Sequence, residues 1–211
     1  MRTLIALLAL ATAASGQAAI VSNGSFEMGV NPGAFRTLGV GSPDVTGWTV
    51  TSGTVDYIGS YWQASDGVRS IDMSGGSIGT ISQTLALTSG TRYTLTFDLS
   101  ANPDGGLGLN PYDVQVDLTG IGSSTFSYSL TGANSASNML WSGKSLTFTA
   151  ASGATTLSFT SLQNKACCWG PALDNVSVSA VPEASTWSML IVGFGLVGAV
   201  ARRRSQTTAV A

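Results

Sequence analysis

Apolar and polar residues alternate with a period of two along several short segments in the middle of this chain. The clearest segment covers residues 92–99, and shorter ones cover residues 114–118, 126–130, 146–148 and 157–159. This alternation is typical of half-buried β-strands, and glycine-containing turns separate the segments. We therefore expect an all-β fold, an antiparallel β-sandwich of jelly-roll type, that occupies residues 20–180 as a single domain.

The N-terminal segment has the layout of a secretory signal peptide. Arg2 precedes an apolar stretch at residues 4–14, and Gly16 and Ala18 satisfy the small-residue requirement of a cleavage site. We expect residues 1–19 to be this signal peptide, with signal peptidase as the processing partner. Cleavage falls after Ala18 or one residue later.

The C-terminal segment contains an uncharged apolar run followed by three arginines. Residues 185–201 form 17 uncharged residues, which span roughly 26 Å as a helix at about 1.5 Å per residue. This length comes close to a bilayer core of about 30 Å, so we predict one short transmembrane helix over residues 185–201. The positive-inside rule places Arg202, Arg203 and Arg204 and the tail 205–211 in the cytoplasm, with Trp187 at the opposite interface. A core helix of the globular domain is the alternative.

The same segment resembles the PEP-CTERM sorting tail of Gram-negative bacteria. The resemblance covers residues 181–204 and rests on Pro182, Glu183, Trp187, the glycine-bearing helix and the three arginines, while Ala184 stands where the motif usually has a second proline. It implies an exosortase that cuts close to Pro182-Glu183. The protein would be anchored transiently in the inner membrane and then reach the cell surface or extracellular matrix.

Motifs along the predicted domain resemble the choice-of-anchor C family of bacterial surface proteins. They include NGSFE at residues 23–27, GW at 47–48 and GPALDNVSV at 170–178, and they also resemble plant cell-wall proteins with a galactose-binding-like domain. The resemblance implies a non-catalytic carbohydrate-binding-like jelly roll, with extracellular polysaccharide as a partner. The alternative is a structural matrix or adhesion protein with no sugar ligand.

Composition restricts the chemistry of the domain. The chain has no histidine, which excludes Ser-His-Asp and Cys-His catalysis. The predicted domain contains five basic and ten acidic residues, a net charge of −5, which argues against nucleic acid and favours a neutral polymer or a cation. A glycan hydrolase needs two carboxylates, and the pairs Asp66/Asp72 and Asp98/Asp104 leave this as a remote alternative. We therefore expect no enzymatic activity.

Glu27 and Asp174 are candidate ligands of a structural calcium ion. Asp174 shares strand parity with Val176 and Val178, so the sequence predicts an inward carboxylate, which needs a partner. In jelly-roll carbohydrate modules, which the chain resembles, a glutamate of the first strand and an aspartate of the last strand help hold calcium, and these positions match Glu27 and Asp174. Alternatively, Asp174 accepts hydrogen bonds from a turn and Glu27 is solvated.

Aromatic residues are the expected sugar contacts, because the apolar face of a pyranose stacks on exposed rings. Tyr61 and Trp62 lie in a polar, glycine-flanked segment, where Gln63, Asp66 and Arg69 could orient hydroxyl groups. Trp141 is a further candidate in a loop setting, although it could equally plug the space under a loop, and Trp48 and Tyr57 are expected in the core.

Cys167 and Cys168 are adjacent in a chain expected to be exported, where thiols tend to be oxidised. Three outcomes stay open, namely a vicinal disulfide, two free thiols or an intermolecular link. The sequence favours the vicinal disulfide, as a stiffener of the loop that enters the last strand.

Overall fold

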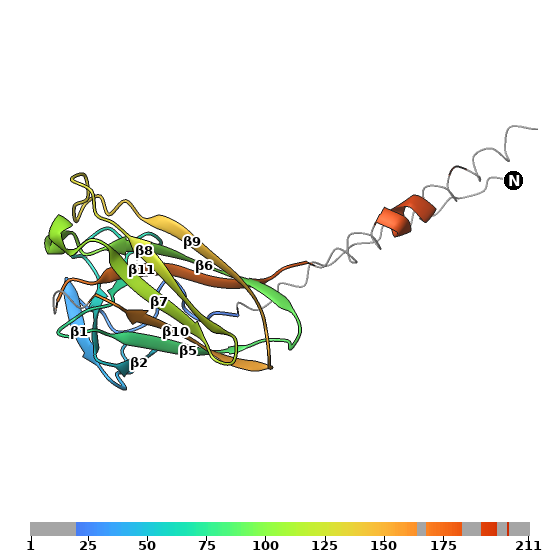
Figure 1. Ribbon diagram of the computed structural model, residues 1–211, viewed down its shortest axis with the longest axis horizontal. Coiled ribbons are helices and arrows are strands. Elements are labelled where there is room, and N and C mark those ends of the chain that lie inside the picture. Colours follow the sequence, from blue (N-terminus) through green and yellow to red (C-terminus); the bar gives the residue numbers. More distant parts are fainter. Residues whose placement is uncertain (1–19, 164–167, 183–190, 198–201, 203–211) are drawn as a thin grey trace, which may run out of the picture.

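The computed structural model describes residues 20–163, 168–182, 191–197 and 202. Its strands form two packed sheets (Figure 1), one with the order β1-β3-β4-β11-β6-β9 and one with the order β2-β5-β10-β7-β8. Every strand pairing recorded within these sheets is antiparallel. This arrangement confirms the predicted antiparallel sandwich.

The first sheet combines strands from both ends of the domain: β1 (Phe35–Gly39), β3 (Thr54–Ile58), β4 (Ser70–Asp72), β6 (Arg92–Ala101), β9 (Ser142–Thr149) and β11 (Pro171–Ala180). The second sheet contains β2 (Thr49–Ser52), β5 (Thr80–Ala86), β7 (Tyr112–Leu118), β8 (Gly122–Tyr128) and β10 (Ala154–Ser161). Two short 3-10 helices, η1 (Pro103–Gly105) and η2 (Leu107–Leu109), connect β6 to β7.

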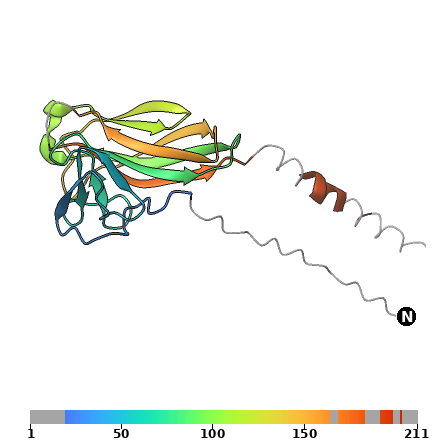
Figure 2. The same cartoon turned by 90° about the horizontal axis from the view of Figure 1, so that it is seen from below.

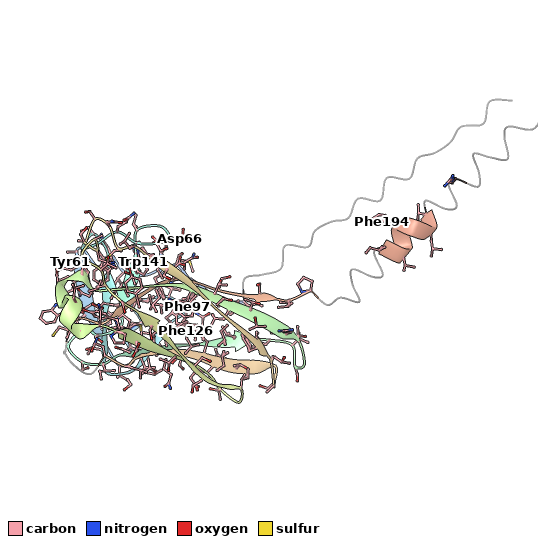
Figure 3. The ribbon with its side chains drawn as sticks, turned by 45° about the horizontal axis from the view of Figure 1, so that its top comes forward. Tyr61, Asp66, Phe97, Phe126, Trp141 and Phe194 are labelled. Carbon is pink, nitrogen blue, oxygen red and sulfur yellow. The ribbon has the colours of Figure 1, made fainter. Side chains whose placement is uncertain are left out.

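The core lies between the sheets and is built by the alternation seen in the sequence. Phe97 of β6 packs edge-on against Phe126 of β8 and Phe159 of β10, with ring centroids 5.1 and 5.2 Å apart (Figure 3). Trp48 and Tyr57 are also buried, as expected. Because neighbouring strand residues face opposite sides, the residues between these apolar positions face outward.

One row of residues crosses the outer face of the six-stranded sheet. The pairing registers place Thr37 opposite Asp56, Asp56 opposite Asp72, Asp72 opposite Ala172 and Ala172 opposite Ser100. Directly opposed residues have Cβ atoms about 4.5–5.5 Å apart, so Asp56 and Asp72 are close neighbours. Their core-facing neighbours Tyr57 and Ile71 are fully buried.

A β-bulge in β11 changes the orientation predicted for Asp174. Asp174 pairs with Asp98, but Ser177 pairs with Thr96, so β11 has one extra residue in this interval, and Asn175 has a positive φ of 51°. Asp174 therefore faces the outer side, although Leu173 and Val176 both belong to the core. The prediction from simple parity was wrong about the face, whereas Asp174 is fully buried.

The terminal predictions fall mainly outside the described residues. The signal peptide, residues 1–19, lies outside them, as do residues 185–190 and 198–201 of the predicted membrane span. Residues 191–197 are helical, and their large apolar side chains, including Phe194, are exposed rather than packed into the sandwich (Figure 3). Within the described part of the chain, no helix meets the length and hydropathy needed to span a membrane.

The sandwich has two distinct ends. The helices η1 and η2 lie at one end, and β11 finishes at the other end, towards the C-terminal segment (Figures 1 and 2). Of the sorting-motif residues, only Pro182 and Arg202 are described, while Glu183, Trp187, Arg203 and Arg204 are not.

Candidate functional site

Three exposed aromatic rings of the described sandwich line the same depression. Phe35, Tyr61 and Trp169 are 48%, 38% and 41% exposed, and no other large aromatic side chain of the described sandwich is as open to solvent. The depression has a volume of about 290 Å³ and lies against the outer face of the six-stranded sheet. We call it the aromatic hollow, and its described lining consists of Phe35, Thr37, Asp56, Ile58, Tyr61, Trp62, Gly75, Asn102, Cys168 and Trp169.

Contacts from separate elements hold these rings. The rings of Phe35 on β1 and Tyr61 lie 5.4 Å apart at 66°, and the Tyr61 hydroxyl donates a hydrogen bond to Asp104 of η1. Trp169 packs against η1, where a Cβ at Gly105 would lie 2.8 Å from the Trp169 Cβ. Both Tyr61, which Figure 3 labels at this end of the sandwich, and Trp169 are therefore held by contacts to η1.

Asp56 supplies a carboxylate to the floor of the aromatic hollow. Its side chain is 8% exposed, and its Oδ1 accepts a hydrogen bond of 2.5 Å from the Thr37 hydroxyl. Its Oδ2 has no hydrogen-bond donor among the residues that the structure describes. Burial raises the pKa of Asp56, and the hydrogen bond from Thr37 opposes this shift.

Asp72 lies beside Asp56 but is fully enclosed. Its oxygens accept hydrogen bonds from the Asn102 amide at 2.8 Å and from the backbone N–H groups of Ser74 and Gly170 at 2.9 and 3.0 Å. Burial raises the pKa of Asp72 to about 7, and its donors oppose this shift. Asn102 also accepts a bond from the backbone of Asp104, so one network joins the sheet to η1.

Trp62 is buried, in contrast to the exposure expected from its polar surroundings. Its side chain is 4% exposed, and its indole N–H donates to the buried Ser70 hydroxyl at 2.8 Å. It belongs to a small apolar cluster with Ile58, Met139 and Ala172. Ala172 makes this part of the outer sheet face apolar, and Trp62 packs over it and shields it from water.

The other predicted sugar contacts are divided between places. Trp62, Gln63 and Arg69 line a second depression of about 790 Å³, which we call the loop hollow, whereas Tyr61 lines the aromatic hollow. The Arg69 guanidinium donates to the Tyr57 hydroxyl at 2.7 Å and lies over the Tyr57 ring. Asp66 is exposed, and it is not part of the described lining of either hollow.

Trp141 packs under a loop, which is the alternative to a sugar contact that the sequence left open. It is half-buried, its indole N–H donates to the Gln63 carbonyl at 2.9 Å, and it packs against the apolar cluster of Trp62. These contacts connect the loop before β9 to the loop between β3 and β4. Whether Trp141 contacts sugar stays a prediction.

Glu27 and Asp174 hold the same loop from two sides. Asp174 Oδ2 accepts from the backbone N–H groups of Ser65 and Asp66 at 2.7 and 3.0 Å. Glu27 Oε1 accepts from those of Val68 and Arg69, both at 2.8 Å. Burial raises the pKa of Asp174 to about 7. Among the described residues, no three acidic or cysteine side chains group as a metal site, so calcium stays a prediction.

Cys168 is disulfide-bonded and lies in the lining of the aromatic hollow. Cys167, the other cysteine of the chain, falls outside the described residues. The vicinal pairing therefore stays a prediction.

The sequence interpretation did not identify the aromatic hollow, because its residues come from distant segments. Asp56 could have been noticed as a charge between the apolar Val55 and Tyr57, and Phe35 as an outward residue of a short strand. No sequence signal brings Asn102 to these residues.

Comparisons with known proteins agree with this architecture. Residues 180–204 match the PEP-CTERM protein-sorting motif, which confirms that prediction. Among solved structures, "Family 16 Carbohydrate Binding Module-2" superposes with a TM-score of 0.52 at 15% identity, covering 76% of this chain and 99% of that one. A carbohydrate-binding module described as "TmCBM61 in complex with beta-1,4-galactotriose" has a TM-score of 0.48 at 14% identity, covering 78% of this chain and all of that one.

Sequence comparisons find one relative and one family model that match the domain. Halomucin of Haloquadratum walsbyi is 36% identical over 164 residues, covering 75% of this chain, and the match spans only 2% of halomucin's length. The choice-of-anchor C name is not confirmed. Residues 19–179 match the model described as "Protein of unknown function (DUF642)", so the chain belongs to the DUF642 family.

Proposed function

We propose that this protein is an exported, non-catalytic glycan-binding module that binds its ligand in the aromatic hollow. The observation that carries the proposal is that Phe35, Tyr61 and Trp169, the exposed rings of the described sandwich, line one depression with a polar floor. The likeness to a carbohydrate-binding module supports the fold on which this depression is built.

The chemistry of the hollow suits a sugar ring. Tyr61 and Trp169 offer faces on which the C–H groups of a pyranose can stack, which contributes about 0.5–1.5 kcal/mol per aromatic contact beyond area burial. Asp56 Oδ2 can accept a hydrogen bond from a sugar hydroxyl, and Asn102 lines the same hollow. The rings provide contact area and the carboxylate provides orientation.

The same geometry argues against glycoside hydrolysis. A hydrolase needs two carboxylates that flank the scissile bond. Asp56 and Asp72 are adjacent, but Asp72 is fully buried and both of its oxygens accept hydrogen bonds from protein donors. Of these two adjacent carboxylates, only Asp56 belongs to the described lining of the hollow.

The sorting motif supports export and surface delivery. In this proposal signal peptidase removes residues 1–19, residues 185–201 anchor the chain transiently in the inner membrane, and an exosortase cuts near Pro182-Glu183. The protein then joins the exopolysaccharide at the cell surface or in the matrix. The aromatic hollow adjoins η1 through the Tyr61–Asp104 hydrogen bond, and β11 finishes at the opposite end of the sandwich from η1 (Figure 2). Mass spectrometry of the mature C-terminus, with and without the sorting enzyme, tests this route.

Glycan binding is tested by Trp169→Ala, measured as retention on immobilised polysaccharides and as binding on a glycan array. Loss of one stacking platform should weaken binding about 2- to 10-fold while the fold stays intact. Ile78→Ala is the matched control, because Ile78 is 40% exposed but lies outside the described lining of the hollow. Self-association without any glycan affinity would support the structural matrix alternative instead.

A further inference from the structure

The aromatic hollow is negatively charged. None of its described lining residues is basic, and Asp56 contributes a carboxylate to its floor. Asp72 is paired with Asp56 across β3 and β4. Asp104 accepts a hydrogen bond from the hydroxyl of Tyr61, at the rim of the hollow. Within the described sandwich, the recorded ion pair joins Arg36 to Asp44 and involves none of these three aspartates.

Asp56 lines this space with a carboxylate group. The side chain is more than nine-tenths buried, Thr37 satisfies Oδ1, and Oδ2 has no donor among the described residues. Because most of the Asp56 side chain is removed from solvent, a cation with N–H donors compensates its negative charge better than a neutral hydroxyl does. The domain itself supplies no such cation within the described lining.

The space above Asp56 is kept open by a glycine. A Cβ at Gly75 would lie 2.9 Å from Asp56 Oδ1 and 3.0 Å from the Thr37 Cγ2, so any larger residue there would crowd the carboxylate. Tyr61 and Trp169 stand over the same space, and aromatic faces attract ammonium groups through their quadrupole. The carboxylate, the aromatic rings and the open volume therefore occur together in this hollow.

We propose that the aromatic hollow selects sugar units that carry a protonated amine, as in a de-N-acetylated amino sugar, over acetylated or neutral units. This inference rests on the proposed glycan-binding function and adds the ligand class. The ammonium group donates to Asp56 Oδ2, and the sugar ring stacks on Tyr61 or Trp169.

Calorimetric titration of the purified full chain tests the proposal with three probes: a glucosamine tetramer, an N-acetylglucosamine tetramer and tetralysine. We expect the glucosamine tetramer to bind at least tenfold more tightly than the other two. Asp56→Asn keeps the acceptor for Thr37 but removes the charge, and it should abolish this preference; Gly75→Ala should do the same by crowding Asp56. Asp117→Asn, an identical change on β7 in the other sheet, should leave it unchanged.

The outcomes separate the two proposals. Equal binding of both sugar tetramers, or a preference that survives both Asp56→Asn and Gly75→Ala, overturns the amine assignment and leaves glycan binding standing. Equal binding of tetralysine also overturns it, because general charge attraction then explains the result. Absence of binding to every glycan of an array, with no effect of Trp169→Ala, overturns the proposed function itself. Unfolding midpoints measured in parallel show whether each variant folds.

Discussion

Replacement of Trp62 by alanine should damage the fold rather than a sugar contact. Trp62 is 4% exposed, packs against Ile58, Met139 and Ala172, and donates to the Ser70 hydroxyl. Removal of a buried tryptophan costs about 3–5 kcal/mol. A domain is stable by roughly 5–15 kcal/mol, and each kcal/mol shifts Tm by about 2–4 °C in a domain of this size, so Trp62→Ala should lower Tm by about 6–20 °C.

The assay is urea and thermal unfolding followed by far-UV circular dichroism, which does not depend on tryptophan emission. Trp169→Ala is the matched control, since it makes the same substitution at a side chain that is 41% exposed. We expect Trp169→Ala to cost less than about 1 kcal/mol.

Equal destabilisation by the two variants, or a loss below about 1 kcal/mol for Trp62→Ala, would refute the assignment of Trp62 as the cover of the outer sheet face. Reduced glycan retention by Trp62→Ala can be interpreted as lost contact only if the unfolding midpoint is unchanged.

Three further predictions concern buried carboxylates and a close contact. Asp72 and Asp174 have pKa values of about 7, above the ordinary 3.8, so their contribution to stability is complete below about pH 4 and is lost as the pH rises through 7. Urea unfolding across pH 4–8 should show a decline of up to about 1.4 kcal/mol per pH unit for each group, and Asp72→Asn should flatten it. Gly170→Ala places a Cβ 2.5 Å from Asp72 Oδ1 and should destabilise by about 1–3 kcal/mol in the same assay. If Glu27 holds calcium, added calcium should raise Tm, and Glu27→Gln should remove this rise; a Tm indifferent to calcium and chelator excludes the site.

The strands could be predicted because their signal is local. Residues 92–99, 114–118 and 157–159 lie within β6, β7 and β10, and their apolar members all belong to the core. The alternation of apolar and polar residues can be recognised within a single segment, so the strand can be predicted before its partner strand is known. The shorter strands β1 to β4 contain three to five residues each, too few to give a clear period.

The candidate site could not be predicted because it depends on which face of the sheet each side chain occupies and on contacts between residues that are distant in sequence. The bulge at Asn175 reverses the parity of Asp174, and one extra residue in a strand leaves no clear sequence signal. Tyr61 and Trp62 are adjacent in sequence, yet one is exposed at the rim of the aromatic hollow and the other is buried under a loop. Which of them is covered depends on Met139 and Ala172, which are far away in the chain.

Carboxylates from the two ends of the domain bind one loop. Glu27, from the first motif, and Asp174, from the last, accept four backbone N–H groups of residues 65–69. These bonds already use one oxygen of each carboxylate, and Asp174 Oδ1 accepts from the Asn175 N–H. A calcium ion would therefore have to coordinate chiefly Glu27 Oε2 and carbonyl oxygens. Because residues 67–69 line the loop hollow, its shape follows from these carboxylates with or without an ion.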